Sequence, residues 1–143
     1  VARILDHLPA NNRKKFLETT PIHISDRVTE AEGLSEEFLQ WCGQHPQGTL
    51  WVELLVSRND VPEDVLRNFA HNENDIIRQK VASNVRTPAS VLESLSKETG
   101  GYSVEIRIAV ASNSNTSEAT LLRLSTISAH PQVRLAALST LQK

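Results

Sequence analysis

The segment Ile77-Arg78-Gln79-Lys80-Val81-Ala82-Ser83-Asn84 recurs 29 residues later as Ile106-Arg107-Ile108-Ala109-Val110-Ala111-Ser112-Asn113. The same spacing aligns further pairs: Thr87 with Thr116, Leu92 with Leu121, and Leu95 with Leu124. Agreement of several positions at one spacing indicates an internal repeat, and a period in this range is typical of stacked repeat architectures.

The repeat continues on both sides of this pair. An earlier unit aligns Pro62 with Pro88 at a slightly shorter spacing, and a later one begins at Pro131-Gln132-Val133-Arg134. We therefore predict helical repeats over residues 49–143, in units 49–75, 76–103, 104–130 and an incomplete 131–143. Residues 1–48 do not match the repeat and are interpreted as an N-terminal helical capping segment. Within it, Ser35 is expected to cap a helix over residues 36–42 that Gly43 ends.

Each unit has the pattern of two short helices. Apolar residues of the first helix fall on one face in each unit: Trp51, Leu55 and Val56; Ile77, Val81 and Ala82; Ile106, Val110 and Ala111. Those of the second helix are Val65, Leu66 and Phe69; Val91, Leu92 and Leu95; Leu121, Leu122 and Leu124. Helices this short are marginal in isolation, so we predict that they stack around one aliphatic core, giving an all-α solenoid.

The residues between the helices suggest how each helix begins and ends. Asn84 and Asn113 directly follow the first helices, and asparagine tolerates the left-handed conformation that commonly ends a helix. Thr87 is expected to cap the second helix, with Pro88 at its first position. In the first unit, Asp60 is expected to be the corresponding cap, in an arrangement like a capping box with Glu63.

This combination of residues resembles the leucine-rich repeat variant family. The likeness is carried by Val81-Ala82-Ser83-Asn84 with Thr87-Pro88, and by Val110-Ala111-Ser112-Asn113 with Thr116-Ser117. Residues 131–138 are also similar to a HEAT-repeat helix, so the resemblance spans residues 50–141. It implies a right-handed superhelix of alternating α and short 3₁₀-like helices without strands. One member of the family carries an iron–sulfur cluster on a cysteine-rich segment, a feature not expected here because Cys42 is the only cysteine.

Composition excludes several classes of protein. The formal net charge of −2 over 143 residues gives no support for a strongly basic nucleic-acid binder. No apolar run approaches the ~20 residues that a membrane span requires, so we expect a soluble cytoplasmic protein that does not contact a membrane. The chain begins at Val1 and contains no methionine, which leaves open whether it is a fragment of a longer repeat protein.

Five residues are candidates for an interaction surface. Arg78, Arg107 and Arg134 recur at one position of successive units, and a ladder of guanidinium groups could contact phosphate or an acidic partner. The structural alternative, which we favour, is that each arginine bonds helix-end carbonyls or a carboxylate of a neighbouring unit. Trp41 and Trp51 flank the link between the capping segment and the first unit, where they could anchor a peptide or a base, or pack that segment onto the repeats.

No catalytic, cofactor or metal site is predicted. The five histidines form no pair at metal-ligand spacing, and no phosphate-binding glycine loop, nucleophile elbow or paired-cysteine motif occurs. Cys42 and His45 offer the one candidate for cysteine–histidine chemistry, but two residues three apart at a helix end are weak evidence for it.

We therefore predict a non-enzymatic protein-interaction or scaffold module without a cofactor, whose protein partner the sequence does not name. The alternative is a nucleic-acid-binding HEAT-like protein, in which Lys80 and Arg86 would join the three arginines in one basic groove. Weak self-association through the C-terminal end is also expected, because Leu135 and Leu138 are three residues apart on a face of the last helix that need not be covered.

Overall fold

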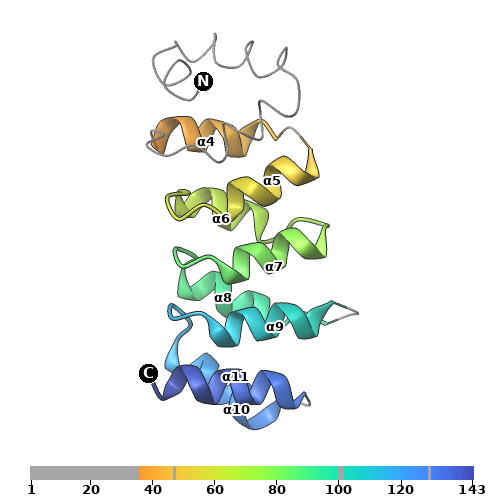
Figure 1. Ribbon diagram of the computed structural model, residues 1–143, viewed down its shortest axis with the longest axis vertical. Helices are drawn as coiled ribbons and strands as arrows, with labels where there is room; N and C mark the ends of the chain where they lie inside the picture. Colours follow the sequence, from red (N-terminus) through yellow and green to blue (C-terminus); the bar gives the residue numbers. More distant parts are fainter. Residues whose placement is uncertain (1–35, 47, 100–101, 129) are drawn as a thin grey trace.

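The computed structural model describes residues 36–46, 48–99, 102–128 and 130–143, and these residues form helices and no strands. In chain order the helices are α4 (Glu36–Gln44), α5 (Thr49–Val56), α6 (Glu63–Phe69), α7 (Asp75–Ser83), α8 (Ala89–Ser96), α9 (Ser103–Ser112), α10 (Glu118–Ile127) and α11 (Pro131–Leu141) (Figure 1). The prediction of an all-α chain is confirmed for this part. Most of the expected capping segment, residues 1–35 with the predicted cap Ser35, lies outside the described residues.

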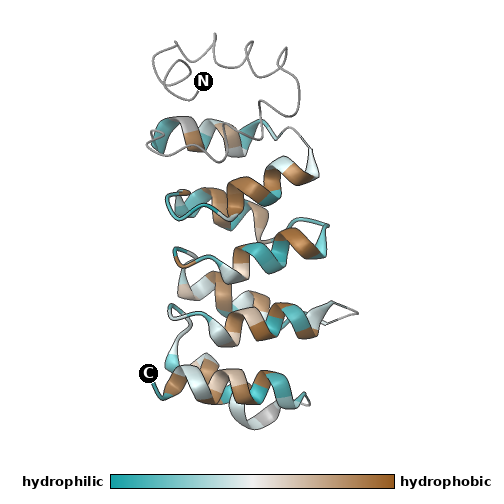
Figure 2. Cartoon of the chain, viewed as in Figure 1, coloured by the Kyte–Doolittle hydropathy of each residue, from teal (hydrophilic) through white to brown (hydrophobic). Residues whose placement is uncertain are grey.

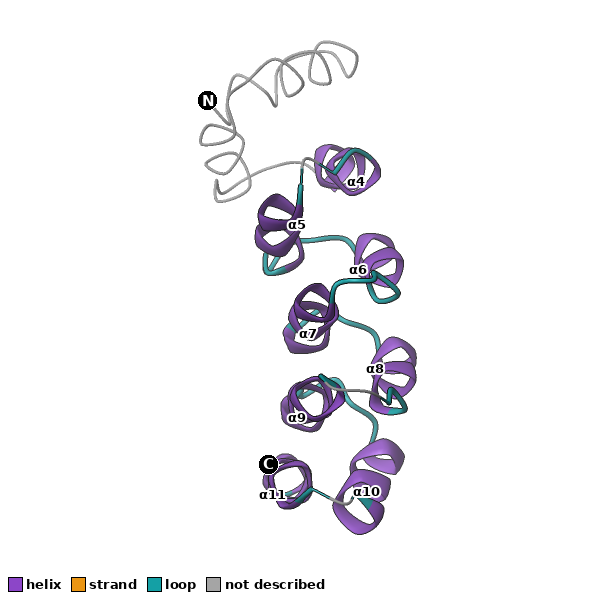
Figure 3. Cartoon of the chain, turned by 90° about the vertical axis from the view of Figure 1, so that its right-hand side faces the viewer, coloured by secondary structure: helices purple, strands orange, loops and turns teal. Residues whose placement is uncertain are grey.

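The helices stand in two columns (Figure 3). We call α5, α7, α9 and α11 the A column, and α4, α6, α8 and α10 the B column. Each A helix packs on the next one along the column, and α10 also packs closely against α11. In the B column, α4 packs on α6 and α8 packs on α10, whereas α6 and α8 are not among the closely packed pairs. The handedness of any superhelix stays a prediction.

Apolar residues recur along the successive helices (Figure 2). Those that are buried form one core cluster to which helices of both columns contribute, as the recurring apolar positions predict. All the predicted A-helix positions are buried, and Leu55, Val81 and Val110 are each 0% exposed. The B-helix positions are also buried, with one exception. Leu122 is 49% exposed, because the face that α10 turns to the core carries Leu121 and Leu124 instead.

The threonines expected to cap the second helices have a different role. Pro88 is the N-cap of α8 and no side chain caps that end of the helix. Thr87 is 0% exposed, and its hydroxyl donates to the carbonyl oxygen of Val81 at 2.5 Å. Thr116 repeats this contact with Val110 at 2.6 Å. A buried hydroxyl must find a partner, and here the end of the preceding A helix supplies it.

The expected capping box of α6 does not form either. Pro62 is the N-cap of that helix, without a side-chain bond. Asp60 instead forms a two-point ion pair with Arg58, with nitrogen–oxygen distances of 2.8 and 2.9 Å. The bonds from Arg58, together with the charges of Arg58 and Arg86, lower the pKa of Asp60 against the opposing effect of burial.

Gly43 does not end α4, as the sequence suggested, but lies inside it. A Cβ at this position would lie 2.9 Å from Cγ2 and 3.0 Å from Cγ1 of Val65. The residue is therefore glycine because α6 packs against α4 at this point. The helix reaches Gln44, and Nδ1 of His45 lies 2.9 Å from the carbonyl oxygen of Trp41 in its last turns.

The asparagines after the A helices are extended, not left-handed as we predicted. Asn84 has φ −75° and ψ 132°, and Asn113 has φ −84° and ψ 127°. In this conformation the Asn84 amide reaches the previous unit, where it donates to the carbonyl oxygens of Val56 and Arg58 at 2.7 and 2.9 Å. A contact between units, and not the way in which the helix terminates, therefore explains why this position is asparagine.

Candidate functional site

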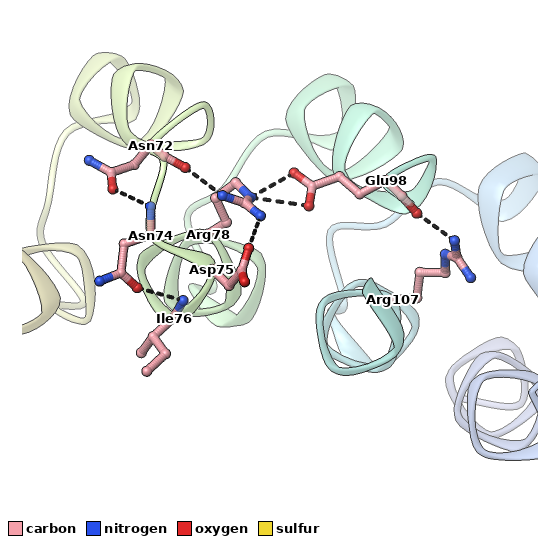
Figure 4. Close-up of polar contacts among 7 residues, drawn as sticks. All are labelled: Asn72, Asn74, Asp75, Ile76, Arg78, Glu98 and Arg107. Carbon is pink, nitrogen blue, oxygen red and sulfur yellow. Dashed lines mark hydrogen bonds and ion pairs between the residues drawn. The ribbon is translucent and has the colours of Figure 1, made fainter. Parts of the chain in front are cut away.

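Arg78 holds two helix ends together (Figure 4). Its Nη1 donates to the carbonyl oxygen of Asn72, just beyond α6, at 2.6 Å, and its Nη2 bonds Asp75. Its Nε lies 2.9 Å from a carboxylate oxygen of Glu98, just beyond α8. The guanidinium therefore ties the start of α7 to the ends of the B helices before and after it.

Arg107 and Arg134 make the same kind of backbone contact. Arg107 donates to the carbonyl oxygen of Glu98, and Arg134 donates to that of Ser128 at 2.8 Å. In all three cases the acceptor lies within three residues of the end of the preceding B helix. These contacts are those expected of the structural alternative, in which the recurring arginines hold the units together.

The two tryptophans differ in accessibility. Trp51 is 2% exposed and lies in the core, and among the described residues its Nε1 has no hydrogen-bond partner. Trp41 is half-buried, and its ring stacks on His45 with centroids 4.4 Å apart and planes inclined by 21°. Burial places Trp51 in the core, not on a surface that a partner could reach.

Cys42 and His45 do not form an accessible site. Cys42 is only 1% exposed, so its thiol lies within the core. His45 stacks on Trp41, and its Nδ1 faces the carbonyl oxygen of that residue. In the part of the chain that the structure describes, no three histidine, cysteine or acidic side chains gather in a way that could hold a metal ion.

A groove that the sequence analysis did not identify runs between α6 and α8. Its volume is about 520 Å³, and it is lined by Arg67, Ala70, His71, Ser90, Val91, Ser94, Leu95 and Glu98. Arg67 and His71 lie along the α6 side, whereas Ser90 and Ser94 lie one turn apart along α8. Ala70, Val91 and Leu95 are almost completely buried and make an apolar floor between these two sides.

Among the described charged groups around the groove, Glu98 is held in an ion pair and Arg67 is not. Arg67 is exposed, and its Nη1 makes only a long contact of 3.4 Å with the hydroxyl of Ser90. Over the described ranges Arg67 forms no ion pair. Glu98, which is the one acid among the described residues that line the groove, is already bonded to Arg78. The groove thus offers one unneutralised guanidinium, an imidazole and two hydroxyls above an apolar floor.

The sequence contained a weak signal for this groove. Arg67, His71, Ser90 and Ser94 occupy outward positions of their helices, which the apolar pattern identifies only as facing away from the core. Whether two such faces meet in a groove depends on the separation of α6 and α8, and that separation is a property of the packed structure.

Comparison with protein-family models, curated proteins and solved structures finds no match to this chain. The resemblance to the leucine-rich repeat variant family therefore stays a prediction. Among the helices that the structure describes, none has the length and apolar character needed to cross a bilayer.

Proposed function

We propose that this chain is a non-enzymatic protein-interaction module, a right-handed α-solenoid of the leucine-rich repeat variant or HEAT-like kind, acting in the cytoplasm. The observation that carries the proposal is the groove between α6 and α8, where Arg67, His71 and two serines surround an apolar floor. An apolar floor with a few polar groups that can fix orientation is the composition of a recognition site. The columns of helices supply a rigid support for it.

The positions of the other candidate residues support this proposal over the alternatives. The three recurring arginines direct hydrogen bonds to backbone carbonyls, so those bonds are already made before any phosphate arrives. A nucleic-acid interface instead depends on basic side chains that are available to neutralise phosphates. An enzyme that used Cys42 would need its thiol to be reachable, and that side chain is 1% exposed.

Site-specific photo-crosslinking in cells tests the proposal. A benzophenone amino acid would replace Ser90 or Ser94 in the groove, and in control chains it would replace the exposed A-column residues Ser83 or Ser112. We expect the same protein to be captured from both groove positions and from neither control position. Crosslinks to nucleic acid, or protein adducts equally abundant at all four positions, would contradict the proposed function.

A further inference from the structure

We propose that the groove between α6 and α8 binds an extended acidic peptide segment in which two carboxylates are separated by one residue. The inference rests on the proposed function and specifies the chemistry of the partner. It is carried by the arrangement of four side chains, Arg67 and His71 on one side and Ser90 and Ser94 on the other.

The spacing along the groove fits an extended chain. Ser90 and Ser94 are separated by about 6 Å along α8, since a helix rises about 1.5 Å per residue. In an extended peptide, side chains two residues apart point to the same side and are separated by about 6.5–7 Å. Arg67 and His71 are likewise four residues apart on the α6 side of the groove. An extended peptide can therefore direct two alternate side chains toward this side, and the intervening side chain toward the serines.

The charge of the groove selects acidic side chains on the α6 side. Arg67 has no carboxylate partner among the described residues, and a guanidinium binds carboxylates with strong, directional hydrogen bonds. His71, two residues beyond α6, lines the same groove and offers a second donor. Glu98 also lines the groove, but both of its carboxylate oxygens lie within 3.1 Å of Nε of Arg78, which reduces its repulsion of an anion.

The shape favours a peptide over a small molecule. Small-molecule pockets enclose most of the ligand surface. Here Arg67, His71, Ser90 and Ser94 are all exposed, so the site is an open trough along two helices. A peptide can lie in such a trough, make backbone hydrogen bonds to the two serine hydroxyls, and cover Val91 and Leu95.

The neighbouring acids limit the length of the acidic stretch. Glu63 and Asp64 precede Arg67 by four and three residues on the exposed surface of α6. They would repel a third carboxylate placed beyond the one at Arg67. We therefore expect a short acidic pair to be recognised, and a longer acidic run to gain little more.

Fluorescence anisotropy with labelled ten-residue peptides tests this inference on the whole chain. The probe contains Glu-Ser-Glu within a neutral Gly/Ala sequence; its controls contain Gln-Ser-Gln, Lys-Ser-Lys or the adjacent pair Glu-Glu-Ser. We expect the probe to bind at least about tenfold more tightly than the glutamine and lysine controls, because charge-assisted hydrogen bonds are about twice as strong as neutral ones. It should also bind more tightly than the adjacent pair, because neighbouring side chains of an extended chain point to opposite sides; equal binding of these two peptides would contradict the proposed spacing. Arg67→Gln should weaken binding of the probe by a similar factor. Lys97→Gln removes the same charge from the residue that follows α8, outside the groove, and should leave binding of the probe unchanged.

Arg67 is exposed, so its variant should keep the helical circular dichroism spectrum of the parent chain. Equal binding of the acidic and neutral peptides, equal effects of Arg67→Gln and Lys97→Gln, or no binding at millimolar peptide would each overturn the inference. Tighter binding of a ten-nucleotide single strand than of the acidic probe would overturn it as well. If crosslinking at Ser90 and Ser94 still captured one protein, the proposed function would stand while this peptide chemistry failed; if crosslinking failed too, both would be rejected.

Discussion

Nδ2 of Asn113 donates a 2.8 Å hydrogen bond to the carbonyl oxygen of Asn84, the asparagine at the same position one unit earlier. It also donates to the carbonyl oxygen of Ala82 at 2.9 Å. Asn84 makes the same pair of bonds to the unit before it, and the hydroxyl of Thr140 continues the series to Ala111 at 2.6 Å. The series links all four A helices through buried or partly buried side chains.

Replacement of Asn113 tests this series of bonds. Asn113→Ala removes two hydrogen bonds, one to the carbonyl oxygen of Ala82 and one to that of Asn84, which still accepts the N–H of Thr87 at 3.2 Å. We expect a loss of about 1–3 kcal/mol in the free energy of unfolding. Asn113→Asp should cost more, because carboxylate oxygens can only accept and would face two acceptors. Chemical denaturation of both variants measures the losses. Ser114→Ala, in the exposed residue next along the chain, is the control and should stay within about 0.5 kcal/mol of the parent. Equal stability of the three variants would contradict a structural role for the amide.

Replacement of Gly43 by alanine should destabilise the protein, although the same replacement usually stabilises the interior of a helix. Alanine normally stabilises a helix relative to glycine by up to about 1 kcal/mol. Here the added Cβ would lie 2.9 Å from Cγ2 of Val65, so we expect a loss of about 1–3 kcal/mol from overpacking. In a Val65→Ala background the same change should cost less, because the clashing methyl groups are gone. Thermal unfolding of the double-mutant cycle measures this coupling, and a Gly43→Ala variant more stable than the parent would contradict the packing of α4 on α6.

The ion pair between Asp60 and Arg58 predicts a pH dependence of stability. Because folding lowers the pKa of Asp60 below its ordinary 3.8, ionisation of this carboxyl favours the folded state. The contribution is present above pH 3.8 and is lost as the pH falls through the lower, folded-state pKa. Asp60 is 43% exposed at its side chain, so Asp60→Asn should cost no more than about 1 kcal/mol at pH 7. The difference in unfolding free energy between parent and variant should shrink in urea titrations toward pH 3. A difference in unfolding free energy that grew on acidification would contradict a stabilising ion pair between Asp60 and Arg58.

Exposed leucines on α11 predict self-association. Leu138 occupies the position that Val56, Ala82 and Ala111 hold in the preceding A helices, where each is 0% exposed. Leu138 is 44% exposed and Leu135 is 66% exposed. We expect reversible association in sedimentation equilibrium at high concentration, weakened by Leu138→Glu but less by the equally charged Ser139→Glu. A parent chain that stays monomeric from micromolar to millimolar concentration would exclude it.

The core was predictable from sequence because the spacing of apolar residues alone defines one face of each helix. Ile77, Val81 and Ala82 share a face whatever their neighbours are, and all three are buried. Leu122 was misassigned because it adjoins Leu121, and the exact rotation of α10 decides which of the two faces the core.

The polar contacts were not predictable in the same way. Asn84 and Thr87 recur at fixed positions, which shows that they matter, but their partners lie on other segments of the chain. Local rules assign such residues to the caps of the adjoining helices. In the structure the amide of Asn84 bonds carbonyls of the preceding unit, and the hydroxyl of Thr87 bonds the last turn of the helix before it. The groove was even less predictable from the sequence than these contacts, because Arg67 and Ser90 belong to different units and meet only in the tertiary structure.

Distances between spin labels along the A column test the stacked arrangement most directly. Ser57, Ser83, Ser112 and Ser139 hold the same exposed position at the ends of successive A helices. Labels would be attached at positions 57 and 112, and at 57 and 139, in a Cys42→Ala background, with distances measured by electron paramagnetic resonance. Packed helices are about 8–10 Å apart, so we predict separations of about 16–20 Å for the first pair and about 24–30 Å for the second. A separation for the second pair equal to or shorter than that for the first would contradict the stack.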